Sequence, residues 1–229
     1  MKSSPAYLPF CKTRAWLAKF RTARFMDPIY WLGHRFFREM SRGFFGLRVV
    51  AAENAQFEGP ALITSNHVSF LDPPFIGAAF DEDICFLARK TLFRYKFSNW
   101  LLTRWQSIPV DQDRPDPGSM KTIFRRLKAG KKVIVFPEGN RAPDGLLQRG
   151  EPGIGLLIGK AGKVPVLPVR IFGAFEALPR HLAFPRPHQI TVVFGKPWVY
   201  DPANFQSKGK ELYQEISDHV MERIADLHE

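Results

Sequence analysis

From about residue 58 onward, short apolar segments alternate with longer segments that carry a helical pattern. The apolar segments are four to eight residues long, which is typical of buried strands. Repeated alternation of strand and helix predicts an α/β fold with a mixed, mostly parallel sheet flanked by helices. The expected strands are Ala61–Thr64, Ile84–Ala88, Val133–Phe136, Val164–Ile171 and Ile190–Phe194. The expected helices are Pro73–Phe80, Thr91–Trp105, Ser119–Ala129, Gly153–Ala161 and an amphipathic closing segment from about Lys208.

Chain length and cysteine content exclude several other classes of protein. With 229 residues, the chain can bury a core without disulfides or metals. Its two cysteines, Cys11 and Cys85, form no CxxC pair, which excludes a cysteine zinc site and a disulfide framework and fits a reducing compartment. The histidines show no metal-ligand spacing, so we expect no metal and no tightly bound cofactor. No apolar run approaches ~18 residues and no signal-peptide pattern begins the chain, so we expect neither a transmembrane helix nor a secretory signal.

The positive charge of the chain is concentrated in residues 1–48. This stretch has ten basic and two acidic side chains, which accounts for +8 of the net charge of +11. Bulky aromatic side chains lie between the basic ones. A basic, aromatic segment without a long hydrocarbon span is typical of a peptide that lies on an anionic membrane. We therefore predict a membrane-surface helical element over residues 1–48 and an αβ domain over residues 49–229.

Two helices are expected in this basic element, which makes it a basic amphipathic two-helix element. The first covers roughly residues 12–25. The second begins after Asp27, which can cap it, with Pro28 in the first turn, and it ends at Gly43 or Gly46. Two other interpretations stay open: a helical hairpin that only packs on the core, and a nucleic-acid surface, since aromatic and arginine side chains also bind single strands. No nucleic-acid-binding signature supports the latter, so we predict no nucleic-acid partner.

The segment Asn66–Pro73, NHVSFLDP, carries the sharpest chemical signal. It follows an expected strand and precedes an expected helix, which Asp72 would cap and Pro73 would open. In a single helix, side chains five positions apart point about 140° away from each other, so a turn is needed to bring Asp72 to His67. A carboxylate on one imidazole nitrogen fixes the tautomer and leaves the other nitrogen to take a proton from a hydroxyl. An isolated pair with this spacing is more often a surface histidine beside a helix cap.

Two further segments carry signals that are weak in isolation. After the strand Val133–Phe136 the chain continues as Pro-Glu-Gly-Asn-Arg, residues 137–141. Glu, Gly and Arg leaving a strand together indicate a binding loop at the carboxyl edge of the sheet, where Gly allows close backbone approach and Arg can bind a phosphate or carboxylate. The third segment, Val164–Val169, has two prolines inside an apolar strand. They indicate an edge, a bulge or a wall beside a ligand.

In order and spacing, the three segments resemble the motifs of the glycerolipid acyltransferase family, the lysophospholipid acyltransferases typified by 1-acylglycerol-3-phosphate acyltransferase. The family's motifs NHxxxxD, FPEGTR and VPxxPV align with NHVSFLD, FPEGNR and VPVLPV at residues 66–72, 136–141 and 164–169. The resemblance covers residues 62–174, about half of the chain. It implies an αβ core with an N-terminal two-helix element on the membrane, in agreement with the charge pattern.

The resemblance also implies a role for each matching residue. His67 is the general base that deprotonates the acceptor hydroxyl, and Asp72 orients it. The hydroxyl then attacks the thioester of acyl-CoA or acyl-carrier protein, the co-substrate, without a covalent acyl-enzyme. The implied substrate-binding residues are Glu138, Gly139, Asn140 and Arg141 at the glycerol phosphate, Arg89, Lys90 and Arg114 as candidates for the phosphate, and Pro168 on the acyl-chain side.

The chain departs from the family pattern in two places. Asn140 stands where Thr is usual, and in the second motif Gln106 and Gln112 replace a Gly and an Arg, with Arg114 two residues later as a candidate replacement. A displaced guanidinium would alter phosphate recognition, so a lyso-ornithine lipid, lysophosphatidylethanolamine or glycerol 3-phosphate stays open as the acceptor. A non-enzymatic lipid- or nucleic-acid-binding protein is a further alternative, which the intact His67 disfavours.

These features predict a membrane-associated O-acyltransferase that converts lysophosphatidic acid to phosphatidic acid. Its expected partners are an anionic membrane surface, a lysophospholipid and acyl-CoA or acyl-carrier protein. We expect it at the cytoplasmic face of a membrane, as a peripheral or monotopic protein. Because the acyl chain must leave the bilayer to reach the base, an apolar groove should lead to His67.

Overall fold

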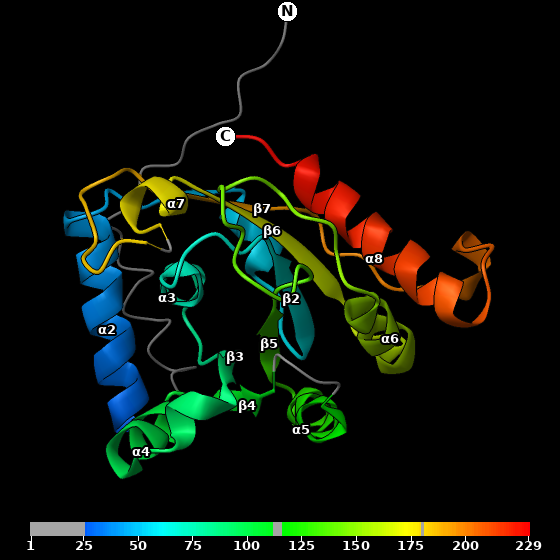
Figure 1. Cartoon of the computed structure of the whole chain (residues 1–229), viewed down its shortest axis with the longest axis horizontal. Helices are drawn as coiled ribbons and strands as arrows, with labels where there is room; N and C mark the ends of the chain where they lie inside the picture. Colours follow the sequence, from blue (N-terminus) through cyan, green and yellow to red (C-terminus); the bar gives the residue numbers. More distant parts are fainter. Residues whose placement is uncertain (1–25, 112–115, 180) are drawn as a thin grey trace, which may run out of the picture.

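The computed structural model describes residues 26–111, 116–179 and 181–229, which form one seven-stranded sheet with helices on both faces (Figure 1). The strands are β1 (Arg48–Val50), β2 (Ala61–Ser65), β3 (Cys85–Arg89), β4 (Ser107–Val110), β5 (Lys132–Val135), β6 (Val166–Phe172) and β7 (Thr191–Phe194). The α-helices are α2 (Pro28–Gly43), α3 (Asp72–Ala78), α4 (Lys96–Arg104), α5 (Pro117–Lys128), α6 (Pro152–Ala161), α7 (Ala174–Ala177) and α8 (Gly209–Ala225). The 3-10 turns are η2 (Ala52–Ala55), η3 (Lys90–Phe93) and η4 (Pro202–Asn204).

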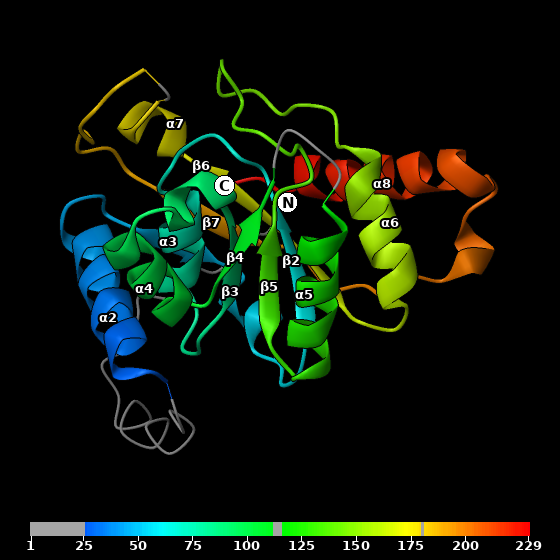
Figure 2. The same cartoon turned by 60° about the horizontal axis from the view of Figure 1, so that its bottom comes forward.

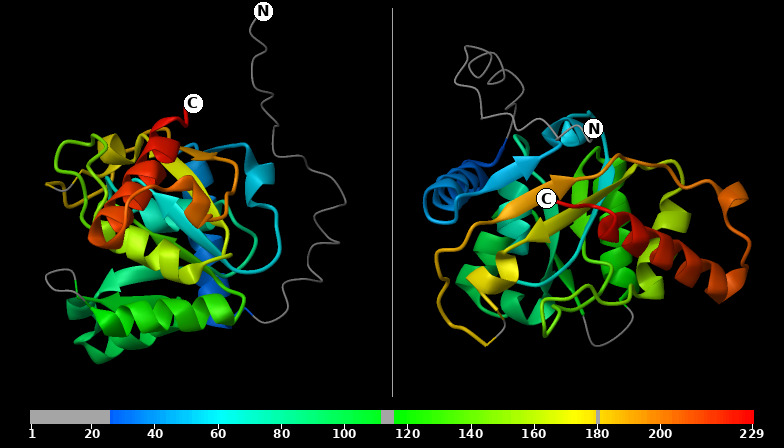
Figure 3. Two further views of the ribbon diagram at one scale, coloured as in Figure 1. Left: turned by 90° about the vertical axis from the view of Figure 1, so that its right-hand side faces the viewer. Right: turned by 90° about the horizontal axis from the view of Figure 1, so that it is seen from above.

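The sheet is mixed and mostly parallel, as expected from the alternation of strands and helices. Its strand order is β1-β7-β6-β2-β5-β3-β4. Every neighbouring pair is parallel except β6 and β7, which are antiparallel. Strands β1, β7 and β6 lie side by side along one end of the sheet (Figure 3). The carboxyl ends of β2, β3, β4, β5 and β6 therefore all meet at the same edge.

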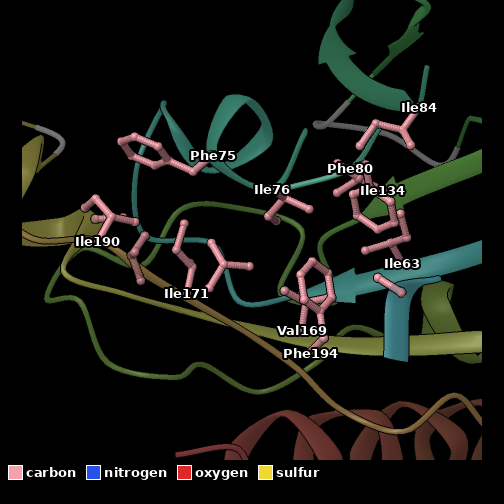
Figure 4. Close-up of a cluster of buried hydrophobic side chains, with 14 of the residues drawn as sticks. Ile63, Phe75, Ile76, Phe80, Ile84, Ile134, Val169, Ile171, Ile190 and Phe194 are labelled. Atoms are coloured by element: carbon pink, nitrogen blue, oxygen red, sulfur yellow. The ribbon is translucent and has the colours of Figure 1, made fainter. Parts of the chain in front are cut away.

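Two apolar layers cover the two faces of the sheet. Successive strand residues face opposite sides, so Leu62 belongs to one layer and Ile63 to the other. The Ile63 layer includes Phe75 and Ile76 of α3 and is drawn in Figure 4. The Leu62 layer packs against α5, α6 and α8. Helices α2, α3 and α4 thus lie on one side of the sheet and α5, α6 and α8 on the other (Figures 1 and 2).

Helix α2 confirms the second helix expected in the N-terminal element. The Asp27 carboxylate accepts a hydrogen bond from the Ile29 N–H at 2.8 Å, and the helix ends at Gly43. The Tyr30 hydroxyl accepts the Ile84 N–H at 3.0 Å, which fixes α2 to the core beside β3. Strand β1 begins at Arg48 and so crosses the predicted domain boundary between residues 48 and 49. The first expected helix, residues 12–25, lies outside the described residues.

Several elements differ from the expectation in ways that have local causes. The single helix expected over Thr91–Trp105 is divided into η3 and α4, which begins only after Tyr95. Strand β4 was not expected, and it tolerates Pro109 because it lies at the edge of the sheet. Strand β1, with three residues, is too short for a pattern to reveal. Helix α8 is the amphipathic closing helix that was expected, with Ile216, Val220 and Ile224 buried.

Within the described parts of the chain, no helix is both long enough and apolar enough to span a membrane. Cys85 is a buried free thiol.

Candidate active site

An apolar cavity of about 370 Å³ opens at the carboxyl edge of the sheet, on the side that α2, α3 and α4 cover. Its walls include Tyr30, Gly33, His34 and Phe37 of α2, Pro73, Pro74 and Gly77 of α3, Leu102 of α4 and the adjacent Trp105. At the sheet edge it is lined by His67, Phe136, Arg89, Asn140 and Arg141. The exposed members of the lining are Phe70, Arg89, Leu92 and Asn140, so these residues mark its mouth. An apolar cavity therefore leads to His67.

His67 and Asp72 meet across a turn between β2 and α3. The distance between His67 Nδ1 and Asp72 Oδ2 is 2.8 Å, and the Asp72 side chain is fully buried. The same carboxylate oxygen also accepts the backbone N–H groups of Val68 and Ser69, each at 2.8 Å. Because a carboxylate only accepts, Nδ1 is the donor, and in the neutral imidazole Nε2 then holds the lone pair. The His67 side chain also lines the cavity, so its geometry suits a general base.

The expectation that Asp72 caps the following helix is wrong. Asp72 is the first residue of α3, Leu71 occupies the capping position, and no side chain caps this helix end. Pro73 and Pro74 in the first turn lack N–H groups, so less capping is needed there. The carboxylate is instead turned back onto the preceding loop, where it holds the residues from His67 to Ser69.

The loop after β5 holds His67 from three sides. The imidazole stacks on the Phe136 ring at 3.9 Å between centroids and 15° between planes. The His67 N–H donates to Glu138 Oε1 at 3.2 Å, and the His67 carbonyl accepts the Ala142 N–H at 2.8 Å. Gly139 turns this loop with a φ of +71°, a conformation that favours glycine. The backbone and the ring of His67 are therefore both fixed by one neighbouring loop.

Glu138 serves the histidine rather than the cavity in this structure. The resemblance places it at the glycerol phosphate, but among the described residues its carboxylate does not line the cavity. Burial raises the pKa of Glu138 to about 7, and the nearby Asp72 charge acts in the same direction. The hydrogen bond from the His67 N–H opposes this rise only in part. Glu138 therefore carries a proton over much of the acidic pH range.

Of the basic residues that the resemblance implies for binding the acceptor's phosphate region, some line the cavity and others do not. Arg89, at the end of β3, and Arg141 both line it, and the Arg141 guanidinium lies 5.6 Å from the centre of the Phe70 ring. Lys90 follows in η3 and is outside the lining. Arg114 lies outside the described residues. The structure thus brings two arginines, Arg89 and Arg141, to the cavity that His67 lines.

Pro168 lies at a bulge in the sheet, not in the cavity wall. Strand β6 pairs Val169 with Phe194, and further along it bridges Val166 to Trp198. The segment after β7 therefore has one residue more than β6 between these two pairs, which makes a bulge opposite Pro168. The Pro168 carbonyl still accepts the Gly195 N–H at 2.8 Å. Of the three explanations for the prolines, a bulge is the one found at this position. The expected acyl-chain role of Pro168 has no support from its position.

Gln106 has an unusual backbone conformation between α4 and β4. Its φ is +59°, a left-handed conformation that glycine adopts without strain, and the family pattern has glycine at this position. The departure in the second motif therefore has a local conformational cost. Gln112, the other departure, lies outside the described residues.

The aromatic lining of the cavity was not predicted from the sequence. Tyr30, Gly33, His34 and Phe37 follow the spacing i, i+3, i+4 and i+7, so the signal was present in the helical periodicity of α2. The sequence did not show which part of the protein this face of α2 would pack against. Within the described residues, no group of three or more His, Cys, Asp or Glu side chains could hold a metal ion.

Comparisons with known proteins point to one family. The chain is 31% identical over 130 residues to the 1-acyl-sn-glycerol-3-phosphate acyltransferase of Bacillus subtilis, covering 56% of this chain and 63% of that protein. It is 29% identical over 174 residues to the enzyme of the same name from Pseudomonas aeruginosa, covering 74% of this chain and 66% of that protein. The matches thus span somewhat less than two thirds of the length of these relatives.

A solved structure has the same fold. The 1-acyl-sn-glycerophosphate (LPA) acyltransferase PlsC from Thermotoga maritima superimposes with a TM-score of 0.66 at 24% identity, covering 96% of this chain and 86% of that one. The model of the family described as Acyltransferase matches residues 46–172, which include β1 to β6 and every described candidate residue of the site. This chain belongs to the Acyltransferase family.

Proposed function

We propose that this protein is a membrane-associated O-acyltransferase that transfers a fatty acyl group from acyl-CoA or acyl-carrier protein to the free hydroxyl of lysophosphatidic acid, giving phosphatidic acid. The observation that carries the proposal is the His67 imidazole, held by Asp72 at 2.8 Å and facing an apolar cavity that two arginines line. The family and the names of its relatives support the reaction and the acceptor.

The chemistry follows from the orientation of the base. His67 Nε2 takes the proton of the acceptor hydroxyl as its oxygen attacks the thioester carbonyl, and the new C–O bond gives a tetrahedral intermediate. Asp72 stabilises the imidazolium that forms. When the C–S bond breaks, the imidazolium returns the proton to the leaving thiolate. No protein nucleophile is needed, because the acceptor supplies the attacking oxygen.

The cavity supplies the recognition that this reaction needs. Its apolar walls suit an acyl chain, which is stabilised by about 0.8 kcal/mol for each CH₂ group removed from water. Arg89 and Arg141 suit a phosphate, because guanidinium groups bind phosphate oxygens in a bidentate manner. Asn140 at the mouth adds an uncharged polar group.

A different acceptor is the second candidate, because the second motif departs from the family pattern in its side chains. Gln106 and Gln112 stand where the family has Gly and Arg, and the left-handed backbone at Gln106 is one that glycine adopts without strain. Lyso-ornithine lipid, lysophosphatidylethanolamine and glycerol 3-phosphate are therefore the acceptors to compare with lysophosphatidic acid. Acceptors with and without a phosphate monoester separate these cases.

Association with the cytoplasmic face of a membrane, as a peripheral or monotopic protein, is part of the proposal. Residues 1–48 carry +8 of the net charge, and α2 exposes Trp31, Leu32 and Phe36. Basic and apolar groups together favour an anionic lipid surface. Raising the salt concentration should release the protein only in part, because inserted apolar groups are not screened.

The test is mass spectrometry of the products formed by the purified full chain in anionic mixed micelles with acyl-CoA or acyl-carrier protein. His67→Ala should lower the rate about 10³-fold, and His181→Ala, an exposed loop histidine, is the matched control. Phosphatidic acid from the wild type and the control, but not from His67→Ala, supports reaction, acceptor and base together. Product only with another acceptor moves the proposal to that lipid, and no product with any acceptor refutes it.

A further inference from the structure

The segment from Lys90 to Arg104 exposes an unusual amount of apolar surface. Neither η3 nor α4 has a buried residue. Four of its large apolar side chains are well exposed, with 39% of Leu92, 76% of Tyr95, 73% of Phe97 and 46% of Trp100 accessible. We name these four residues the η3–α4 surface. A cluster of this kind on a protein marks an interaction site.

The charge of the same segment selects the kind of partner. Residues 90–105 include Lys90, Arg94, Lys96 and Arg104, and residues 84–110 contain no Asp or Glu. Lys90, Arg94 and Lys96 are exposed beside the aromatic side chains. Aromatic and aliphatic side chains interleaved with basic ones fit the interface of an anionic lipid surface, where the apolar groups enter the headgroup region and the cations stay at the phosphates.

The helix that carries this surface is firmly attached to the rest of the protein. The Arg104 guanidinium pairs with the Asp27 carboxylate at 3.0 Å, and the Trp105 indole N–H donates to the Ile29 carbonyl at 3.3 Å. The Trp105 ring also packs edge-on against Phe37 at 5.8 Å. Helices α2 and α4 lie side by side (Figures 1 and 2). Phe97 and Trp100 therefore belong to a fixed helix, and Leu92 and Tyr95 lie in the turn that leads into it.

The same segment borders the cavity. Leu92 of η3 belongs to the exposed rim, next to Arg89, while Leu102 and Trp105 form part of the inner wall. We propose that the η3–α4 surface is a second membrane-docking element, distinct from residues 1–48, which binds an anionic lipid surface and sets the cavity mouth against it. The role in lipid entry rests on the proposed function. The docking itself does not.

Two other partners that could cover the η3–α4 surface fit its positive charge less well. Residues 1–25 of this chain contain six basic and no acidic side chains, so they would be repelled by Arg94 and Lys96. A second copy of the chain also carries a net charge of +11. An anionic surface is the partner whose charge is complementary.

The test is flotation of the full chain with vesicles of phosphatidylcholine mixed with phosphatidylglycerol, and with vesicles of phosphatidylcholine alone. Arg94→Gln/Lys96→Gln should weaken binding to the anionic vesicles about 25-fold, since each basic residue near such a surface contributes about fivefold. The matched control is Lys121→Gln/Arg125→Gln, two exposed cations on α5 at the opposite face of the sheet. It should change binding less than about fivefold.

The apolar part of the surface has its own variant. Phe97→Ser/Trp100→Ser should weaken binding to the anionic vesicles about tenfold or more, and the remaining binding should be released more completely by salt. Phe184→Ser is the control, because Phe184 is 82% exposed but lies in the loop after α7. Circular dichroism checks that each variant is folded.

Unchanged vesicle binding in both double variants overturns the proposal. The proposal is also overturned if the wild type sediments as a dimer and the double variants sediment as monomers while vesicle binding is unchanged. That result would assign the surface to a second copy of the chain. Acyl transfer to a water-soluble, short-chain lysophosphatidic acid should be the same in both double variants as in the wild type. A wild type that binds vesicles through this surface yet transfers no acyl group would refute the proposed function and leave the docking intact.

Discussion

The two regions that border the cavity differ in how firmly their side chains are held. At the sheet edge, His67 is fixed through its ring nitrogen, its ring face, its N–H and its carbonyl. On the η3–α4 surface, Phe97 and Tyr95 are about three quarters exposed to solvent. At the sheet edge, several protein contacts hold the same side chain. On the η3–α4 surface, the described residues leave apolar groups uncovered.

This difference fits the two tasks proposed for these regions. A base that must accept a proton in one geometry gains from a site that is organised before substrate arrives. A surface that binds lipid must keep its apolar groups accessible until it reaches the membrane. Substitutions should therefore have large effects on chemistry or stability at the sheet edge and in the packed layers, and small effects on stability at the η3–α4 surface.

The largest effect is expected from Asp72→Asn. The neutral amide cannot stabilise the imidazolium as a carboxylate does. Its NH₂ group is also a donor, so it cannot accept all the bonds that Asp72 Oδ2 now accepts from His67, Val68 and Ser69. We expect kcat to fall about 10³- to 10⁴-fold. Steady-state kinetics measure this. Asp83→Asn, which removes a carboxylate paired with Lys131 at 2.7 Å, is the control and should retain kcat. A loss of less than tenfold in Asp72→Asn would contradict the role given to this pair.

Next comes Gly155→Ala in the layer behind the sheet, where α6 packs on α8. A Cβ at Gly155 would lie 1.9 Å from the Tyr213 carbonyl oxygen, so the helices must separate, and the free energy of unfolding should fall by about 3 kcal/mol. Gly153→Ala in the same helix meets nothing within 4 Å and should stabilise by ~0.5 kcal/mol. Urea unfolding compares the two. Equal effects would show that the close approach of α6 and α8 is not as described.

Glu138→Gln should alter the pH dependence of stability by an intermediate amount. Folded Glu138 keeps its proton up to a pKa of about 7, against 4.5 in the unfolded chain. Folding therefore takes up a proton between these values, and the free energy of unfolding falls as the pH rises through this window. Glutamine has no such proton, so the variant should lose this fall, which is worth about 2 kcal/mol after allowance for screening by water.

Urea unfolding at pH 4.5 and pH 8 measures the Glu138 effect. Glu176→Gln, an exposed residue of α7, controls for the loss of one carboxylate and should keep the wild-type pH slope. Because the amide oxygen introduced by Glu138→Gln can still accept the His67 N–H, kcat should change less than in Asp72→Asn. An unchanged pH slope in Glu138→Gln would show that this carboxyl group does not titrate in the folded protein as its burial predicts.

The smallest effect is expected from Phe97→Ser on stability. Since most of this side chain is in solvent, the free energy of unfolding should change by less than ~0.5 kcal/mol, while vesicle binding changes. Thermal unfolding without lipid measures the first quantity. A loss above ~1 kcal/mol would mean that Phe97 packs against the protein in solution.

Much of the fold was predictable because its signals are local. The apolar segments that became β2, β3, β5, β6 and β7 lie within a few residues of their expected bounds. Asp27 and Pro28 marked the start of α2 correctly, since a cap and a first-turn proline act on the nearest backbone groups. Strand β1 was missed because three residues show no alternation and depend on pairing with β7.

The site was predictable in its members but not in their connections. The spacing of His67 and Asp72 required a turn between them, and the structure has one. The bond from His67 to Glu138 does not follow from spacing, because it depends on where β5 ends relative to β2. The turning of Asp72 onto the loop is local, but it depends on the conformation of the turn between His67 and Asp72. Pro168 shows the same limit, since the bulge opposite it is a property of sheet register.

The sequence by itself determined the α/β class, the start of α2, the concentration of charge in residues 1–48 and the residue types that can do proton transfer. These follow from side-chain periodicity, capping and composition, which act over a few residues. Tertiary structure alone decided that Glu138 accepts the His67 N–H, that α2 and α4 enclose the cavity, and that the other described residues leave the η3–α4 surface exposed. Those features depend on which faces of distant elements meet, and burial is settled only when the whole chain has packed.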